Sequence, residues 1–287
     1  SVQLQMGETE IGQGADTAFA QMAAETLGIP FKDVHVISTQ DTDISPFDTG
    51  AYASRQSFVT GTAVRHCSEI LRDKILAYAK TLLPEIDTTE LELRDNWIWA
   101  GKEQAISLAA LAEESYYSLT NSSVLTAEVS EQVKKNTIAT GCCFAEVEVD
   151  MKLGKIKVLH IINVHDSGKL LNPQLAEMQV HGGISMGMGY GISEQLILDE
   201  KTGRPLNGNL LDYKLMTILD TPELKADFVE LDDPIGPYGN KALGEPPAIP
   251  CAPAIRNAVL HATGVAFNEN PLTPQRLIDG FQKAGLI

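Results

Sequence analysis

The chain has 287 residues, and its 38 acidic residues outnumber its 22 basic residues, which gives a formal net charge of −16. A hydrophobic fraction of 44% is typical of a globular protein with a sizeable core. A long nucleic-acid interface is not expected, because the chain contains no run of Lys and Arg residues that could neutralise phosphates. No uninterrupted apolar stretch approaches the roughly 20 residues of a membrane helix, and no signal peptide opens the chain. We therefore expect a cytoplasmic protein with no membrane partner.

The N-terminal part of the chain predicts two strands and two helices. The opening SVQLQM starts with Ser and alternates at once, so we expect a strand at residues 2–6 and a chain that is a fragment or one piece of a split domain. Asp16 is expected to cap a helix that ends at Gly28. A second strand is expected at residues 34–38, and a polar loop leads into a longer helix at residues 56–82.

The rest of the chain mixes strands and helices without a repeat. The clearest β pattern is FAEVEVDMKLGKIKVLHIINVHDSG, where apolar residues alternate with acidic ones before a turn near Gly154 and a returning strand. The other predicted elements, in chain order, are a hairpin at 91–106 turning at Gly101, a helix at 108–117, an irregular segment at 118–138, a helix from Asn172 and Pro173, strands at 195–198 and 225–231, and helices at 252–263 and 274–283. The pattern predicts an α+β fold with helices covering mixed sheets. It contains neither a dinucleotide-binding unit nor a P-loop.

The cysteines give no sign of a metal site. The chain contains Cys67, Cys142, Cys143 and Cys251, and none of them forms a C-x-x-C pair. The sequence therefore indicates neither a zinc site nor an iron-sulfur cluster, and no side chains have the spacing of ligands to a first-row metal. Each cysteine is expected to be a small buried apolar residue.

Three segments rich in small residues lie next to helix starts. EIGQGAD places Gln13 between Gly12 and Gly14, where backbone N–H groups and one amide could meet an anionic or polar ligand, or could form only a flexible lead-in. DTGAYASRQSFVTG carries Arg55, which could hold a phosphate or a neighbouring carboxylate. QVHGGISMGMGYG carries five glycines, which permit close helix packing or close approach of a large flat ligand.

A fourth segment, GNKALGEPPAIPCAP at residues 239–253, carries a single carboxylate. Proline disfavours the helical region for the preceding residue, so Glu245 is expected to be extended and its side chain aimed. Gly244 has no β-carbon and lets another group come close. The segment could equally be a rigid surface loop ahead of a helix. Together the four segments indicate a buried, bulky, polar ligand beside one carboxylate.

The order of four motifs resembles a known family. GETEIGQG, DTDISPFDTGAYASR, NPQLAEMQVHGGISMGMGYGI and KALGEPP resemble the C-terminal half of the molybdenum subunit of the xanthine dehydrogenase and aldehyde oxidase family, over residues 1–265. The resemblance implies a molybdenum cofactor, molybdopterin, whose metal is held through the pterin dithiolene rather than by protein ligands. DTD and ASR resemble prokaryotic members, which implies the cytosine dinucleotide form.

The resemblance also implies roles for individual residues. Glu245 matches the active-site glutamate, a general base that takes the proton of the metal-bound hydroxyl while substrate hydride passes to the sulfido ligand. Gln13 matches the glutamine near the oxo ligand, and Gln179 matches a pterin-contacting glutamine. The full set of implied cofactor contacts is Gly12, Gln13, Gly14, Ala53, Ser54, Arg55, Gln179, Gly182, Gly183 and Gly244. We expect a first cofactor-binding lobe at residues 1–140 and a second, carrying Glu245, at residues 141–287.

The implied activity is hydroxylation of a small N-heteroaromatic molecule, xanthine-like or nicotinate-like, with water as the oxygen source. Aldehyde or carbon monoxide oxidation and hydroxyaryl-CoA reduction stay open, and so does a truncated, noncatalytic fragment without cofactor. The expected partners are the other half of the molybdenum-binding subunit and iron-sulfur and flavin subunits carrying iron-sulfur clusters and FAD. We expect the chain to be inactive alone.

Overall fold

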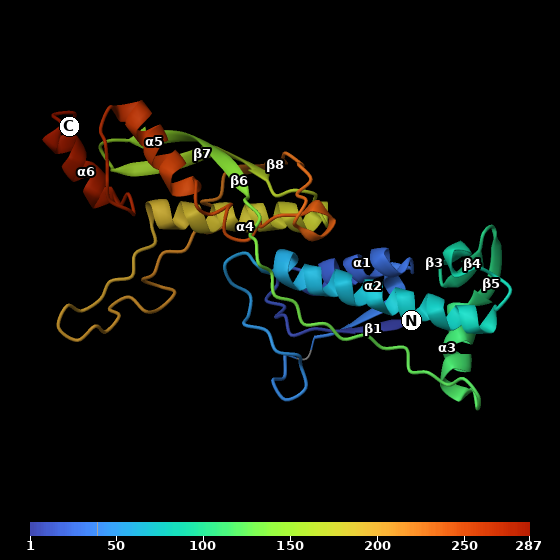
Figure 1. The fold of residues 1–287 in the computed structure, drawn as a ribbon. Helices are drawn as coiled ribbons and strands as arrows, with labels where there is room; N and C mark the ends of the chain where they lie inside the picture. Colours follow the sequence, from blue (N-terminus) through green and yellow to red (C-terminus); the bar gives the residue numbers. More distant parts are fainter. Residues whose placement is uncertain (39) are drawn as a thin grey trace. The chain divides into compact units, whose positions relative to one another are not determined.

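The computed structural model describes residues 1–38 and 40–287. The chain divides into two compact units, a first unit of residues 1–137 with 233–240 and a second unit of residues 138–232 with 241–287 (Figure 1). Each unit combines helices with small sheets, so the predicted α+β fold with mixed sheets is confirmed. No helix within the described residues is both long enough and apolar enough to cross a membrane.

The first unit begins with a strand, a helix and a second strand. β1 (Val2–Gln5) pairs in parallel with β2 (Val34–Ile37), and α1 (Ala15–Leu27) connects them. Helix α1 packs against the long helix α2 (Gln56–Leu82), and Gly28 ends α1 in the left-handed conformation. These four predicted elements are confirmed to within a residue or two.

A three-stranded antiparallel sheet and a third helix complete the sequence of elements in this unit. They are β3 (Leu91–Arg94), β4 (Trp97–Ala100), β5 (Glu103–Ser107) and α3 (Leu108–Tyr117). The predicted single hairpin is wrong, because a second turn occurs at Asp95 and Asn96, whose φ values are 50° and 64°. Asp and Asn tolerate this left-handed conformation better than most residues, so the turn needs no glycine.

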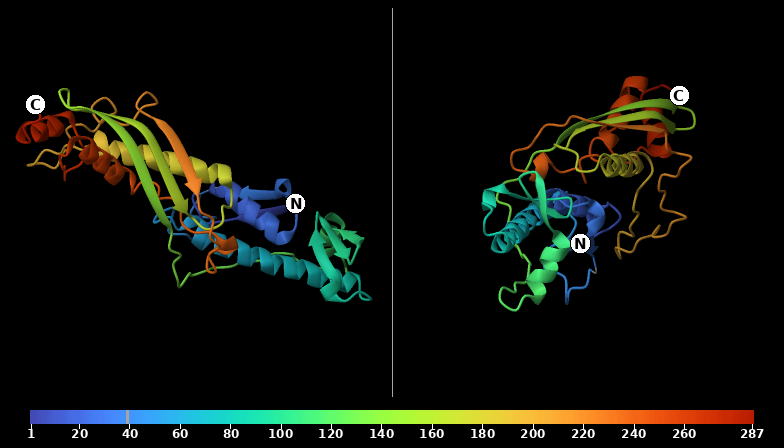
Figure 2. Two further views of the ribbon diagram at one scale, coloured as in Figure 1. Left: turned by 90° about the horizontal axis from the view of Figure 1, so that it is seen from above. Right: turned by 90° about the vertical axis from the view of Figure 1, so that its right-hand side faces the viewer.

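The second unit is a three-stranded sheet with helices on one face (Figure 2). β6 (Thr140–Asp150) pairs antiparallel with β7 (Lys155–Asp166), and β7 pairs in parallel with β8 (Glu223–Phe228). The helices are α4 (Pro173–Ile192), α5 (Cys251–Thr263) and α6 (Pro274–Lys283). Apolar side chains of α4 and α5 meet those of β7 in one buried cluster, and those of α5 and α6 form a second cluster. Phe144, on the other face of the sheet, is exposed.

Three glycines of α4 allow the chain around Pro247 to pack against the helix. A β-carbon on Gly183 would lie 2.5 Å from the Pro247 Cβ, and one on Gly187 would lie 2.5 Å from the Ala248 carbonyl oxygen. A β-carbon on Gly191 would lie 3.2 Å from Ala252. The spacing of four residues puts these glycines on one side of the helix. Helix packing, one of the two interpretations of this segment, is therefore confirmed for these positions.

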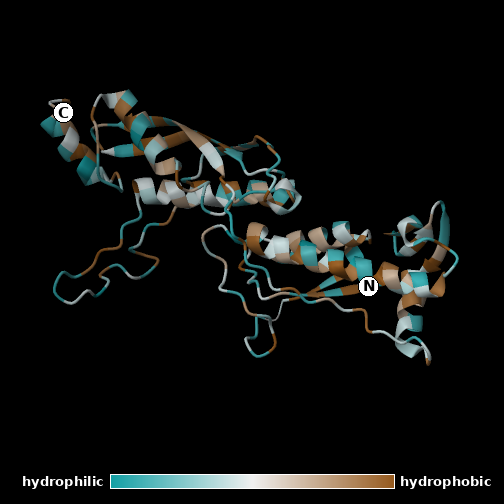
Figure 3. Ribbon diagram, viewed as in Figure 1, coloured by the Kyte–Doolittle hydropathy of each residue, from teal (hydrophilic) through white to brown (hydrophobic). Residues whose placement is uncertain are grey.

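The segment between α4 and β8, residues 193–222, is named the arm. The strand predicted at residues 195–198 is wrong, because only an isolated bridge joins Leu198 to Pro205. The side chain of Asn207 takes the place of a partner strand: its Oδ1 accepts from the Ile197 N–H, and its Nδ2 donates to the Gln195 carbonyl. Apolar and polar residues alternate irregularly along the arm (Figure 3). Its exposed large apolar side chains are Leu196, Ile197, Leu198, Leu206, Leu210, Leu211, Leu215, Ile218 and Leu219.

Two adjacent glycines of α4 provide a matched test of the packing. Gly183→Ala is expected to destabilise the protein by about 1–3 kcal/mol, because Pro247 and its backbone have to move. Gly182→Ala is expected to be neutral or stabilising by up to about 1 kcal/mol, since its new methyl group would meet no atom within 4 Å and Ala favours the helix. Urea unfolding of both variants measures the difference. Equal stabilities would contradict the packing role of Gly183.

Candidate functional site

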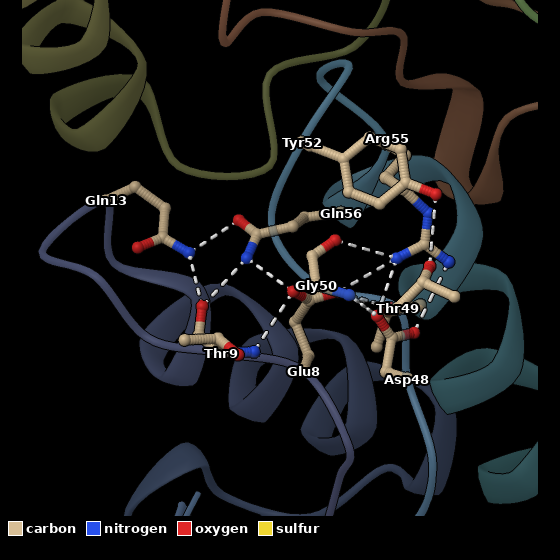
Figure 4. Close-up of polar contacts among 10 residues, drawn as sticks. Glu8, Thr9, Gln13, Asp48, Thr49, Gly50, Tyr52, Arg55 and Gln56 are labelled. Carbon is tan, nitrogen blue, oxygen red and sulfur yellow. Dashed lines mark hydrogen bonds and ion pairs between the residues drawn. The ribbon is translucent and has the colours of Figure 1, made fainter.

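A buried carboxylate organises the loop that carries Gln13 (Figure 4). Glu8 is 2% exposed, and it accepts hydrogen bonds from the Gln56 amide at 2.6 Å and from the Thr60 hydroxyl at 2.7 Å. The Gln13 amide nitrogen donates to the Thr9 carbonyl at 3.0 Å and to the Gln56 side-chain oxygen. Glu8 therefore orients Gln56, and Gln56 in turn orients the Gln13 amide.

A second carboxylate, Glu10, closes the same loop. The N–H groups of Gly12 and Gly14 donate to its Oε1 at 2.7 and 3.1 Å, and that of Asp16 donates to its Oε2 at 3.1 Å. Burial raises the pKa of Glu10, but these donors outweigh it and hold the pKa below its usual value. The predicted cap is wrong: Gly14, with φ 86°, occupies the N-cap position, and Asp16 already lies inside α1. The backbone donors expected to meet an anionic ligand are bound to Glu10.

Arg55, at the start of α2, is held by carboxylates. Its guanidinium donates to Asp48 at 2.7 and 3.3 Å and to the Gly50 carbonyl at 3.1 Å, and it lies 3.8 Å from Glu8. The Asp48 contact raises the pKa of Arg55 against the effect of burial. The neighbouring-carboxylate interpretation is confirmed by these contacts. Contact with a phosphate stays a prediction.

Two residues before Arg55 adopt an unusual backbone conformation. Ala53 and Ser54 have φ values of 52° and 53°, in the left-handed region that favours glycine. Each such residue costs about 1–2 kcal/mol relative to the right-handed conformation. Strain of this kind persists where the surrounding structure determines it, and it is concentrated at functional sites.

Glu245 lies in the segment of residues 241–250, named the Glu245 segment. Its side chain is exposed, and its carbonyl accepts from the Ala248 N–H at 3.0 Å. Pro247, two residues later, is buried against Gly183, and its carbonyl accepts from the fully buried Asn163 amide at 2.8 Å. The rigid mount predicted from the two prolines is thus supported by packing and by a buried hydrogen bond.

The other end of the Glu245 segment is fixed by an ion pair. The Lys241 ammonium lies 2.6 Å from the Asp166 carboxylate, and both side chains are 11% exposed. The Lys241 N–H also donates to the Ser167 carbonyl at 2.7 Å. Burial raises the pKa of Asp166, but the Lys241 contact and the Gly168 N–H outweigh it, so the pKa is lowered. Asp166 ends β7, so the strand determines where the segment begins.

The remaining predicted residues lie on α4. Gln179 is half-buried, in the second turn of the helix. Gly182 is exposed, with open space where a β-carbon would be, whereas Gly183 contacts Pro247. Gly182 is therefore the glycine of this pair that leaves room for a ligand.

Each unit brings together part of the predicted set. The first unit joins Gln13 and Arg55 through Glu8, and the second unit joins α4 to the Glu245 segment. Sequence reasoning missed the residues that orient these groups, which are Glu8, Glu10, Gln56, Asp166 and Lys241. The sequence signal that could have found three of them is their position within the motifs, because Glu8 and Glu10 lie in GETEIGQG and Lys241 is the first residue of KALGEPP.

Known proteins resemble the chain in sequence and in fold. Residues 1–222 match the family model of the molybdopterin cofactor-binding domain. The chain is 50% identical to the xanthine dehydrogenase molybdenum-binding subunit of Escherichia coli O157:H7, over 100% of this chain and 38% of that subunit. It is 30% identical to the carbon monoxide dehydrogenase large chain of Afipia carboxidovorans, over 90% of this chain and 32% of that one. The structure of quinoline 2-oxidoreductase from Pseudomonas putida 86 superposes with a TM-score of 0.88 and 27% identity, over 99% of this chain and 37% of that chain.

The chain therefore belongs to the molybdopterin cofactor-binding domain family. The resemblance to molybdenum subunits of the xanthine dehydrogenase and aldehyde oxidase family, predicted from the order of the motifs, is confirmed. The chain spans less than half the length of the relatives that it matches.

The side chains present fit such a cofactor in kind. Arg55, Gln13 and Gln179 are guanidinium and amide donors, and Gly182 leaves open space beside α4. In residues 1–38 and 40–287 no group of three or more His, Cys, Asp or Glu residues could hold a metal ion. A cofactor that brings its own metal ligands is compatible with this composition. Both N–H hydrogens of Gln13 are already bound, one by Thr9 of the same loop and one by Gln56 of α2. A bond from the Gln13 amide to a ligand has to replace one of these two.

The Asp166–Lys241 pair should matter strongly for stability. Asp166→Asn leaves a buried ammonium without its counter-charge and is expected to destabilise the protein by about 3 kcal/mol. Because the folded-state pKa of Asp166 is lowered, the stabilisation is present above the ordinary carboxyl pKa and is lost as the pH falls through the folded value. Urea unfolding at pH 7 and at decreasing pH measures both effects. The exposed Asp232→Asn is the control. Equal losses of stability in the two variants would contradict the expected contribution of the Asp166–Lys241 pair.

Proposed function

We propose that the chain forms part of a molybdenum-dependent oxidoreductase that hydroxylates an N-heteroaromatic substrate with oxygen from water. The observation that carries the proposal is the fixed Glu245 segment: an exposed carboxylate between the Lys241 ion pair and the buried Pro247, within a chain 50% identical to a xanthine dehydrogenase subunit. Two of the similar proteins, xanthine dehydrogenase and quinoline 2-oxidoreductase, are named for N-heteroaromatic compounds. These names favour that substrate class.

The proposed cofactor contacts are amide and guanidinium side chains and glycine positions. When bound, the molybdenum cofactor supplies the oxygen-transfer and electron-accepting chemistry. Gln179 and Gly182 are proposed to contact the pterin, and Gln13 to donate an amide hydrogen bond near the metal. Gly12, Gly14 and Glu10 fix the backbone that presents Gln13, and the Ala53–Ser54 turn presents Arg55. Gly183 lets Pro247 pack against α4, and Gly244, which has no β-carbon, is proposed to let another group come close to Glu245.

Glu245 is proposed to be the general base. Its carboxylate accepts the proton that water-derived oxygen loses on attacking an electron-poor carbon of the substrate. The packing of Pro247 and the Lys241 pair limits how far the carboxylate can move, and such positioning supplies part of the rate enhancement. Since Glu245 is exposed in this chain, water has to be excluded by substrate, cofactor or a partner.

The proposed partners are another molybdenum-binding polypeptide and subunits carrying iron-sulfur clusters and FAD. The chain spans 38% of a molybdenum-binding subunit, which supports a requirement for more of that subunit. The arm adds a physical reason, because it exposes a run of Leu and Ile side chains that a folded partner would cover. We propose that the chain is inactive without these partners and that the cofactor has the cytosine dinucleotide form.

A second reaction class has support from relatives that are named for aldehydes and for carbon monoxide. The carbon monoxide dehydrogenase large chain is 30% identical to this chain, so aldehyde or carbon monoxide oxidation is the alternative within the family. Turnover of N-heteroaromatics, aldehydes, hydroxyaryl-CoA compounds and carbon monoxide by the assembled enzyme separates these possibilities. Turnover of aldehydes alone would refute the proposed substrate class.

The role of Glu245 is open to direct measurement. Glu245→Gln in the assembled enzyme is expected to lower kcat by roughly two to four orders of magnitude, because the amide cannot accept the proton. Molybdenum content should not change, since Glu245 itself is not among the proposed cofactor contacts. The exposed Glu200→Gln in the arm is the matched control and should leave kcat unaffected. Near-normal turnover of the Glu245 variant would remove the assigned role.

Cofactor binding is tested by metal content. The chain is expected to carry no stoichiometric molybdenum when purified alone and about one molybdenum per chain when purified with its partner subunits, because one pterin site is proposed. Elemental analysis of both preparations decides the point. Absence of molybdenum from the complex would favour a noncatalytic scaffold instead.

A further inference from the structure

Two thiols lie close together beneath the Glu245 segment. The sulfur atoms of Cys143, on β6, and Cys251, the first residue of α5, are 3.9 Å apart, although 108 positions separate them in the chain. Cys251 is 0% exposed and belongs to the core, whereas Cys143 is partly exposed. A disulfide holds its sulfurs about 2.0 Å apart, so the two sulfur atoms have to approach each other for the bond to form.

The hydrogen bonds around Cys251 connect it to the Glu245 segment. Its thiol donates to the Pro247 carbonyl at 3.2 Å. Asn163, which faces Cys143 across the β6–β7 ladder, directs its amide nitrogen to the same carbonyl and toward the Cys251 sulfur at 3.8 Å. Pro247 therefore keeps its buried donor Asn163 if Cys251 loses its hydrogen.

The two thiols differ in acidity, and the difference favours oxidation of Cys143 first. The hydrogen-bond contact with the Cys251 sulfur lowers the pKa of Cys143, against the effect of burial. The neighbouring Cys143 and burial raise the pKa of Cys251. Cys143 is thus the thiol that ionises first and that solvent can reach, and reactive cysteines combine these two properties.

The adjacent Cys142 is not part of this arrangement. Successive residues of a strand project to opposite faces of the sheet, so Cys142 is exposed on the far side from Cys251. The expectation that every cysteine is buried is therefore confirmed only for Cys251: Cys142 is exposed, and Cys67 and Cys143 are partly exposed. A bond between Cys142 and Cys143 would require the strand to distort, which makes Cys142 a natural control.

We propose that Cys143 and Cys251 form a dithiol site that hydrogen peroxide converts into an intramolecular disulfide. The Cys143 thiolate attacks a peroxide oxygen, the O–O bond breaks, and the leaving hydroxide takes a proton to become water. The Cys251 sulfur then attacks the sulfur of the resulting sulfenic acid, the S–O bond breaks, and the second water leaves with the Cys251 proton. Two thiols lose two electrons and two hydrogens, and one peroxide becomes two waters. This chemistry does not depend on the proposed oxidoreductase activity.

Peptide mapping tests the site in the full chain, purified with the subunits that it assembles with. The reduced protein is treated with one equivalent of hydrogen peroxide, alkylated, and digested with trypsin without reductant. Residues 136–152, which contain Cys142 and Cys143, and residues 242–256, which contain Cys251, are separate tryptic peptides. We expect these two peptides to be joined, lighter by two hydrogens than their sum, and to separate on reduction.

Three variants identify the participants. Cys142→Ser should retain the joined peptide, whereas Cys143→Ser should lower its yield at least about tenfold, since the attacking thiolate is gone. Cys251→Ala should leave Cys143 as a sulfenic or sulfinic acid, with no joined peptide. Cys143→Ser changes a partly exposed residue. Its unfolding midpoint is measured as a control, and an unchanged midpoint shows that misfolding does not cause the loss of the joined peptide. A joined peptide that persists in Cys143→Ser, or oxidation of Cys142 ahead of Cys143, would overturn the proposal.

Discussion

The position of the Glu245 segment depends on a buried ion pair at the end of β7. Charges removed from water are tolerated only when they are paired, so the Lys241 ammonium has to remain beside Asp166. Strand β7 also supplies Asn163, whose amide holds the Pro247 carbonyl. One strand therefore anchors the chain both before and after Glu245. The register of β7 is fixed by its pairing with β6. The position of the Glu245 segment therefore depends on the pairing of these two strands.

The first unit follows the same principle with a different set of groups. Glu8 is buried and ionisable, and its oxygens are satisfied by Gln56, Thr60 and the nearby Arg55 guanidinium. Only one amide separates this buried carboxylate from Gln13. In both units, then, a polar group that is proposed to meet a ligand or substrate is held in place by a buried charged side chain with defined partners. Such support keeps a side chain in place without the ligand, which lowers the entropy lost on binding.

Most of the fold could be predicted because its elements have strong local signals. Helix α2 and the β6–β7 hairpin have long, regular hydrophobic patterns, and both lie within a few residues of their predicted bounds. Two of the errors occur where side chains replace backbone contacts. Glu10 caps α1 from outside the helix, and Asn207 substitutes for a strand in the arm. Neither contact has a periodicity that a sequence pattern could reveal.

The candidate site divides in the same way. Glu245 and Gln13 stand out because glycine and proline surround them, and those residues restrict the backbone directly. Asp166 and Lys241 do not stand out in the sequence, because their role depends on a contact between residues that are 75 positions apart in the chain. The glycines of α4 look equivalent in the sequence. Only the structure separates Gly183, which packs against Pro247, from Gly182, which does not.

The division of the chain into units has a consequence for how it can be dissected. The boundaries after residues 137, 232 and 240 mean that the polypeptide passes between the units three times. No single cut can therefore release either unit as one continuous piece. A fragment ending at residue 137 lacks Tyr238, whose hydroxyl donates to the Met22 carbonyl of α1. Rearranged genes, in which residues 233–240 are rejoined to residues 1–137 through a linker, are the route to an isolated first unit.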